Sequence, residues 1–167
     1  MVDSPDTTGR AGRRNDYRIQ KDRHPVILTL VGGESLVGSM FVQAYARHHS
    51  DREDPRDILN ESETFFPLLT EQGETLLIPK ARVLEVSGDT SSDRPGSPPV
   101  SGPGVSIAVT LVGGTVRTGR VFLDMPGPAP RPLDFLNHSP DRFFALHEDE
   151  GVRLINRDLI ERVHPLD

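Results

Sequence analysis

Apolar side chains occupy every second position in two short segments that lie far apart in the chain, residues 26–30 and residues 107–111. A period of two places one side of an extended strand against a core. Gly32-Gly33 follows the first segment and Gly113-Gly114 follows the second. Adjacent glycines accept positive φ without a steric penalty, so each pattern predicts a half-buried strand that enters a tight hairpin turn.

The residues after each glycine pair predict a run of further short strands. A second strand runs through Gly38 or Gly119, and a glycine inside a strand indicates a bulge or sharp bend. A short strand is expected at residues 57–60 and at residues 134–137, followed by a strand at each Phe-Phe pair. The sequences IPKARV and NRDLI predict a single 3₁₀ turn between the last two strands.

The same landmarks therefore occur twice in one order. LTLVGG is matched by VTLVGG, DILN by DFLN and FFPL by FFAL, with only small changes in spacing. Ordered self-similarity of this kind indicates an internal duplication. Residues 87–104, SGDTSSDRPGSPPVSGPG, separate the two copies and have the serine, glycine and proline content of a linker.

We expect an all-β protein made of two tandem small barrels, each with five or six strands. The first barrel spans residues 24–86 and the second spans residues 105–167. A strongly bent meander of this length closes most easily into a small barrel. Residues 1–23, in which basic residues outnumber acidic ones, are expected to be a disordered basic arm.

Charge and composition narrow the classes of function. The net charge is -6, and because the arm is basic the remainder is more acidic still, which disfavours non-specific binding to nucleic acid. The chain has no cysteine, which excludes disulfides and suits a reducing cytoplasm. No secretory signal and no apolar membrane span is visible. The arginine, aspartate, glycine and proline content is typical of a high-GC genome, so a bacterial cytoplasmic protein is expected.

The start of each repeat resembles the first sequence motif of the Sm-like small barrels. Gly33 and Gly38, like Gly114 and Gly119, have the Gly-x4-Gly spacing of that motif, and VFLD ends at Asp124 as the motif does. The end of each repeat is similar to the strand, 3₁₀ turn, strand ending of Sm-like and Src-homology-type barrels. The resemblance implies a small barrel and, for the Sm-like family, RNA binding by a ring of such units.

The residues of the Sm-like uridine pocket are not carried over. Pro128 stands where the family has asparagine, and Gln43 replaces the aspartate in the first repeat. Lys80-Ala81 and Arg157-Asp158 replace the family's basic residue followed by glycine. Sm-like RNA binding is therefore kept as an alternative function, and it predicts a steep dependence of binding on salt.

Four polar residues recur at equivalent positions of the two repeats: Asp57 and Asn60 in the first, Asp134 and Asn137 in the second. Such side chains commonly accept from a nearby backbone N–H and stabilise a turn. The competing hypothesis is that they bind a ligand in a pair of equivalent pockets.

Two further clusters suggest specific ligands. Arg14 and Arg18, with Arg13 beside them, resemble the arginine motif with which PilZ domains bind a cyclic dinucleotide, since guanidinium groups suit phosphate. The second PilZ motif, Asp/Asn-x-Ser-x-x-Gly, is not found in the chain. His48 and His49 lie in an acidic loop whose counterpart in the second repeat has no such residues, so a polar loop is favoured over a metal site. Neither metal nor cofactor is expected.

The expected function is a non-enzymatic binding or assembly module. No catalytic or nucleotide-binding signature is found. Small barrels bind through edge strands, so equivalent edges are expected to pair with each other, with another copy of the chain or with a partner protein. Each Phe-Phe pair should place one ring in the core and one on the opposite face, against the second repeat or a partner. A PilZ-like nucleotide sensor is the remaining alternative.

Overall fold

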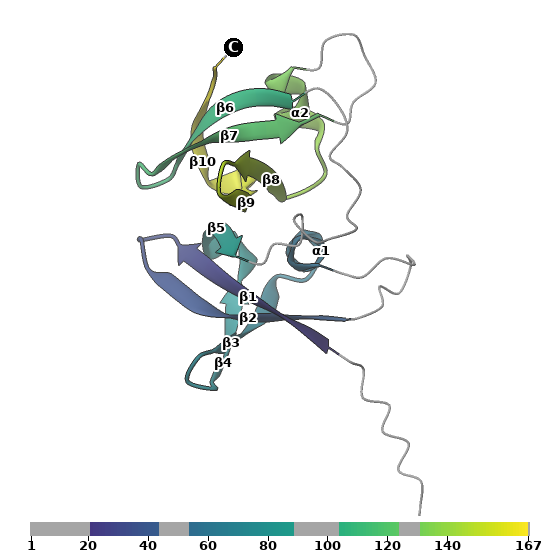
Figure 1. Cartoon of the computed structure of the whole chain (residues 1–167), viewed down its shortest axis with the longest axis vertical. Coiled ribbons are helices and arrows are strands. Elements are labelled where there is room, and N and C mark those ends of the chain that lie inside the picture. Colours follow the sequence, from purple (N-terminus) through teal and green to yellow (C-terminus); the bar gives the residue numbers. More distant parts are fainter. Residues whose placement is uncertain (1–20, 44–53, 89–103, 124–130, 167) are drawn as a thin grey trace, which may run out of the picture.

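The computed structural model describes residues 21–43, 54–88, 104–123 and 131–166, which form two lobes of the same design (Figure 1). The first lobe comprises β1 (Lys21–Leu30), β2 (Ser35–Gln43), α1 (Pro55–Asn60), β3 (Phe65–Thr70), β4 (Thr75–Pro79), a 3₁₀ turn (Lys80–Arg82) and β5 (Val83–Gly88). The second lobe comprises β6 (Gly104–Leu111), β7 (Val116–Phe122), α2 (Pro132–His138), β8 (Phe143–Glu148), β9 (Gly151–Asn156), a 3₁₀ turn (Arg157–Leu159) and β10 (Ile160–Pro165). The two lobes have the same order of elements, which is the order that an internal duplication predicts.

The ten strands belong to a single antiparallel sheet in the order β10-β6-β7-β8-β9-β5-β1-β2-β3-β4. Each lobe has five strands in the same order, with its fifth strand beside its first. Between the lobes, Glu85 of β5 pairs with Ile155 of β9, and Val86 pairs with Leu154. Figure 1 shows these two strands where the lobes meet.

The prediction of a β protein is confirmed, but the prediction of two closed barrels is wrong. Closure would require the fifth strand of a lobe to pair with the fourth strand of the same lobe. In the first lobe, β5 uses its second edge to pair with β9 of the other lobe instead. The strands therefore form one open sheet that runs through both lobes.

The strand predicted at residues 57–60 is also wrong, because these residues end α1, and residues 134–137 lie in α2. Proline at the first helical position is compatible with a helix start, since its missing N–H would have no helical partner. Asp54 and Asp57 add a capping box in which each side chain accepts from the other residue's backbone N–H, at 3.0 and 2.9 Å.

The boundaries of the lobes shift slightly from the expected ones. β1 begins at Lys21 rather than at residue 24, and Ser87, Gly88 and Gly104 belong to strands rather than to the linker. The rest of the predicted arm and linker lies outside the described residues. The predicted 3₁₀ turns and the hairpins at the glycine pairs are confirmed, and all four hairpin glycines have positive φ.

Gly38 and Gly119 lie where two strands cross closely. A Cβ atom on Gly38 would lie 2.5 Å from the carbonyl oxygen of Leu69 on β3, and one on Gly119 would lie 2.6 Å from that of His147 on β8. These are backbone atoms of the neighbouring strand, which cannot move aside as a side chain can. The absence of a side chain thus permits the close approach of the neighbouring strand. The pairing with the preceding strand continues through both glycines, so no bulge is present there, and a sharp bend stays a prediction.

Two clusters of buried apolar residues lie one in each lobe, and each takes side chains from the other lobe. The first cluster contains Val26, Leu28, Phe66 and Leu68 of the first lobe together with Phe143, Ala145, Val152 and Leu154 of the second. The second cluster contains Ile107, Val109 and Phe144 together with Leu84 of β5. Neither lobe completes its core alone.

Substitution of Gly38 by alanine should lower the free energy of unfolding by about 1–3 kcal/mol, because β2 and β3 must separate to admit the methyl group. Gly119→Ala should have a similar effect at the equivalent crossing. Gly104→Ala is the control, since the three atoms nearest to its Cβ would all belong to the movable side chain of Arg120. Urea denaturation measures all three variants, and equal losses in Gly38→Ala and Gly104→Ala would contradict the close-crossing argument.

Candidate interaction surface

The contact between the lobes is the best-developed interaction surface in the described part of the chain. Asn60, the last residue of α1, binds the backbone of Phe143 at the start of β8 with both ends of its amide. Its Nδ2 donates to the carbonyl oxygen of Phe143 at 3.0 Å, and its Oδ1 accepts from the N–H of Phe143 at 2.8 Å. A two-bond contact of this kind fixes both the position and the direction of β8 against the first lobe.

Two more buried polar residues join the 3₁₀ turn of the first lobe to its surroundings. Asn156 of β9 donates to the carbonyl oxygens of Lys80 at 3.3 Å and Val83 at 2.9 Å. The ammonium group of Lys80 donates to the carbonyl oxygen of Glu61, just beyond α1, at 3.0 Å. Burial lowers the pKa of Lys80 below its ordinary value, and nearby Glu61 partly opposes that shift.

A charged network crosses the same contact. Glu85 of β5 is buried and accepts from Arg117 of β7 at 2.6 and 2.9 Å and from Arg153 of β9 at 3.1 Å. Arg153 also pairs with Glu148 at 2.7 Å. The hydrogen bond to Glu85 raises the pKa of Arg117 above its ordinary value. A buried carboxylate needs such partners, and both of these arginines come from the second lobe.

The Phe-Phe pairs divide as the sequence predicted. In the second lobe, Phe144 lies in the lobe's own core while Phe143 lies in the core cluster of the first lobe, with none of its side chain exposed. In the first lobe, Phe66 is buried and Phe65 is 55% exposed. Phe65 thus holds the position that Phe143 holds at the contact, but the described residues do not cover it.

β4 and β10 are the two outer strands of the sheet, and each has a paired strand on one side only in the described part of the chain. The outer strand β4 is apolar along its middle, and Leu77 on it is 69% exposed. β10 carries Glu161 and Arg162, whose side chains are 51% and 71% exposed. The backbone groups on the outer side of such strands are available to bind another extended segment.

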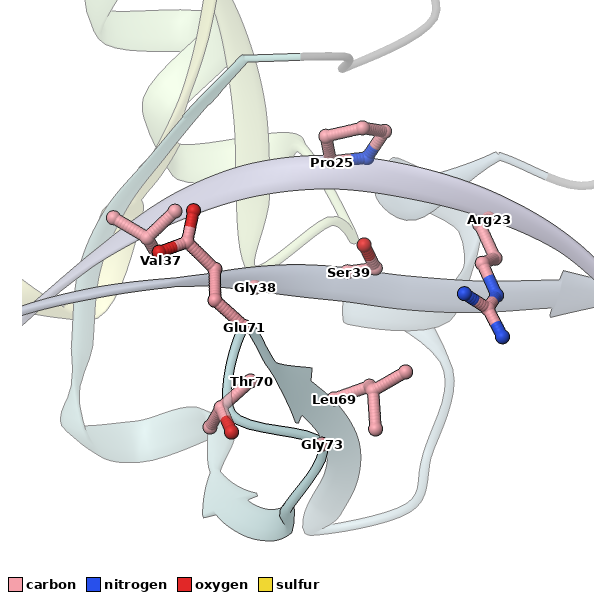
Figure 2. A pocket seen from close by; sticks show the side chains of 9 residues that line it. All are labelled: Arg23, Pro25, Val37, Gly38, Ser39, Leu69, Thr70, Glu71 and Gly73. Atoms are coloured by element: carbon pink, nitrogen blue, oxygen red, sulfur yellow. The ribbon is translucent and has the colours of Figure 1, made fainter.

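A half-open hollow of about 450 Å³ lies where β2 crosses β3 in the first lobe. Figure 2 shows its lining, with Arg23 and Pro25 from β1, Ser39 from β2 and Leu69 and Glu71 from β3 and the turn after it. Arg23 lies 5.6 Å above the ring of Phe41. The hollow brings a single cation and a single anion together with small polar groups.

The equivalent place in the second lobe is occupied by side chains. Arg120 of β7 donates to the carbonyl oxygen of Gly104 at 3.3 Å and lies 5.8 Å above the ring of Phe122. The Phe122 ring in turn meets His147 edge to face at 4.8 Å. Each lobe thus places an arginine on an aromatic ring here, but the arginine comes from the first strand of one lobe and the second strand of the other.

The four predicted polar residues have different surroundings. Asp57 belongs to the capping box of α1, and Asn60 belongs to the contact between the lobes. Asp134 lies in the first turn of α2, where its backbone oxygen bonds the ring of His138, and Asn137 is exposed near the end of α2. The structure does not bring the two pairs together, and a ligand-binding role for them stays a prediction. Arg14, Arg18, His48 and His49 lie outside the described residues.

Sequence reasoning missed the residues that join the lobes through charge and hydrogen bonds: Glu85, Arg117, Arg153 and Asn156. A signal for one of them was present. Glu85 interrupts the apolar run VLEV, and an acid at the centre of a buried strand calls for a basic partner. Its partners could not be identified without the pairing of the lobes.

Among the described residues, no group of three or more histidine, aspartate or glutamate side chains has the arrangement of a metal site. None of their helices is long and apolar enough to cross a membrane. In comparisons with protein families, curated proteins and solved structures, nothing matched this chain.

Asn60→Ala should lower the free energy of unfolding by about 1–3 kcal/mol, because the N–H and carbonyl of Phe143 lose their partners at a part-buried position. Asn137→Ala is the matched control from the second lobe and should have a negligible effect in dilute protein. Chemical denaturation of both variants provides the test. Equal stability of Asn60→Ala and the parent chain would show that the two bonds do not hold the lobes together.

Glu85→Ala should be more damaging, with a loss of about 3–5 kcal/mol, because it leaves Arg117 and Arg153 near the contact without their shared partner. Asp158→Ala removes one acid from the exposed pair with Arg142 and should cost less than about 1 kcal/mol. The two values come from denaturant titrations at the same ionic strength. A cost for Glu85→Ala as small as that of Asp158→Ala would contradict the assignment of a buried network.

Proposed function

We propose that this chain is a non-enzymatic interaction module that binds proteins by adding strands to the outer edges of its sheet, β4 and β10. The observation that carries the proposal is the pairing of β5 with β9, since it is the same kind of contact formed within the chain itself. Edge pairing supplies backbone hydrogen bonds, and neighbouring side chains supply selectivity.

The exposed apolar residues beside β4 support this proposal. Soluble proteins usually protect an outer strand with charges or cover it, because an apolar edge promotes association. The middle of β4 has no charged residue, and Leu77 and Phe65 are both more than half exposed beside it. Contiguous exposed apolar residues of this kind are typical of a binding surface.

β10 differs from β4 in a way that suits a selective surface. Its Glu161 and Arg162 are exposed charged residues, and Pro165, which has no N–H to donate, is its last residue. A partner for this edge must therefore accept charged side chains next to the shared backbone bonds. The two edges would accordingly select different segments, which suits a protein that links partners.

A photo-reactive amino acid placed at Leu77 on β4 or at Glu161 on β10 tests the proposal in the cells that make the protein. Both positions should give covalent adducts with protein, because a bound strand would lie within reach of either side chain. The same group at Thr118, exposed on the inner strand β7, is the control. Adducts that form equally at Thr118, or at none of the three positions, would contradict binding at the edges.

A further inference from the structure

The duplication gives each residue of the contact between the lobes a counterpart at the equivalent position of the other lobe. The strand registers show which residues of the two lobes are equivalent. Leu28 pairs with Val86 in the first lobe, and Val109 pairs with Val163 in the second. Phe66 likewise pairs with Ile78, and Phe144 pairs with Ile155. On this equivalence β10 corresponds to β5, and β4 corresponds to β9. The two outer strands of the sheet, β10 and β4, are thus the counterparts of β5 and β9, which pair with each other between the lobes.

We propose that the partner of these edges is a second copy of the chain, joined head to tail so that β10 of one molecule pairs with β4 of the next. The proposal rests on the proposed function and names its partner. If β10 and β4 pair in the same register as β5 and β9 (the inner contact), Arg162 would lie opposite Ile78 of the next molecule, and Val163 opposite Leu77. The contact is heterologous, so it closes into a ring or continues as a filament according to the rotation between copies.

The side chains that cover the first lobe have exposed counterparts ready to cover the next molecule. Phe143 and Leu154 are fully buried against the first lobe, and their counterparts are Phe65 and Leu77. Those two are 55% and 69% exposed in the single chain. Head-to-tail pairing would bury both against the second lobe of the neighbour, as the inner contact buries Phe143 and Leu154.

The two-bond amide contact has a counterpart as well. Asn60 binds the backbone of Phe143, and the corresponding residues are Asn137 and Phe65. Asn137 is exposed at the end of α2 and makes no side-chain hydrogen bond with the described residues. In the head-to-tail contact its amide would bind the backbone N–H and carbonyl of Phe65 in the next copy. This gives the predicted recurrence of asparagine in the two repeats a single explanation.

The contact does not repeat at every position. Asn156 corresponds to Pro79, which has no side-chain amide to donate, and Leu84 corresponds to Glu161. The other charged residues differ as well, and they distinguish the two contacts. Glu85 corresponds to Arg162, while Arg117 and Arg153 correspond to Leu36 and Leu76. Arg162 placed at the inner contact would face two arginines, so β10 cannot replace β5 there. At the head-to-tail contact Arg162 would face leucines instead. Its aliphatic stem can pack on them while its charge points toward water.

The experiment is a complementation between two variants, one for each edge. Leu77→Asp damages the β4 side, and Asn137→Ala damages the β10 side; both positions are exposed, so the single chain should fold normally. Sedimentation velocity and light scattering follow the mean mass from about 1 to about 500 µM, against a single-chain mass of 18.4 kDa. Val37→Asp, an exposed apolar residue on the inner strand β2, is the matched control.

The parent chain and Val37→Asp should assemble beyond a single copy. Each edge variant alone should associate at least about ten-fold more weakly, because every head-to-tail contact needs one intact edge of each kind. An equal mixture of the two variants should regain the parent affinity and stop at two chains, since Leu77→Asp still offers β10 and Asn137→Ala still offers β4.

Three results would overturn the inference. The first is a parent chain that stays single throughout the concentration range, and the second is a variant that still dimerises alone, which indicates a symmetric contact. The third is an assembly that carries absorbance at 260 nm and is lost on nuclease treatment. None of these results would contradict the proposed function. Photo-crosslinked adducts of another protein at Leu77 and Glu161 would still support binding at the edges.

Discussion

The pairing of β5 with β9 is the interaction on which the rest of this structure depends. A lobe of five short strands encloses little volume, and a core of that size contributes little stability on its own. Here the strand pairing brings Phe143 and Leu154 into the first core and Leu84 into the second. The sheet hydrogen bonds and the burial of apolar surface are therefore formed at the same place, and neither lobe is complete without the other.

The polar groups at this contact fix its geometry more than they add to its strength. Burying Glu85 costs solvation that its two arginines only offset, as is usual for buried ion pairs. A slip of β5 against β9 by one residue would turn Glu85 toward the apolar face of the sheet and separate it from Arg117 and Arg153. Asn60 and Asn156 also oppose a slip of the strands, because their amides bind particular backbone groups of the other lobe. Together these residues specify one register.

The internal duplication, the strands and the 3₁₀ turns were predictable because they follow from local signals. Alternation of apolar residues, the glycine pairs and the Phe-Phe pairs each determine structure within a few residues of themselves. The helices were missed because a six-residue helix shows no full apolar period, although Asp54, Pro55 and Asp57 form a recognisable helix start. The expectation of closed barrels failed for a different reason. Which edge a strand pairs with is decided by competition between distant segments, and the sequence of one repeat contains no record of it.

The equivalent asparagines show the same limit at the level of a site. Their recurrence indicated a shared role, and local reasoning offered a turn cap or a ligand pocket. In the structure the Asn60 amide instead binds the backbone of a strand residue eighty-three positions away in sequence. No spacing rule could have suggested this partner. Conversely, the three-residue spacing between Asp54 and Asp57 is that of a capping box, so the role of Asp57 could be inferred from the sequence. That interaction is confined to a single helical turn.

The charge difference between Glu85 and Arg162 has a consequence for how such a protein can diversify. In a single-lobe ancestor, one pair of surfaces would have to serve every contact, so a change that improved one contact would change all of them. Joining two copies in one chain makes the inner contact intramolecular, with a high effective concentration that tolerates costly specialisation such as a buried carboxylate. The outer surfaces are then released to drift or adapt independently. A covalent tandem thus divides between two sites the work that a single self-complementary surface must do at once.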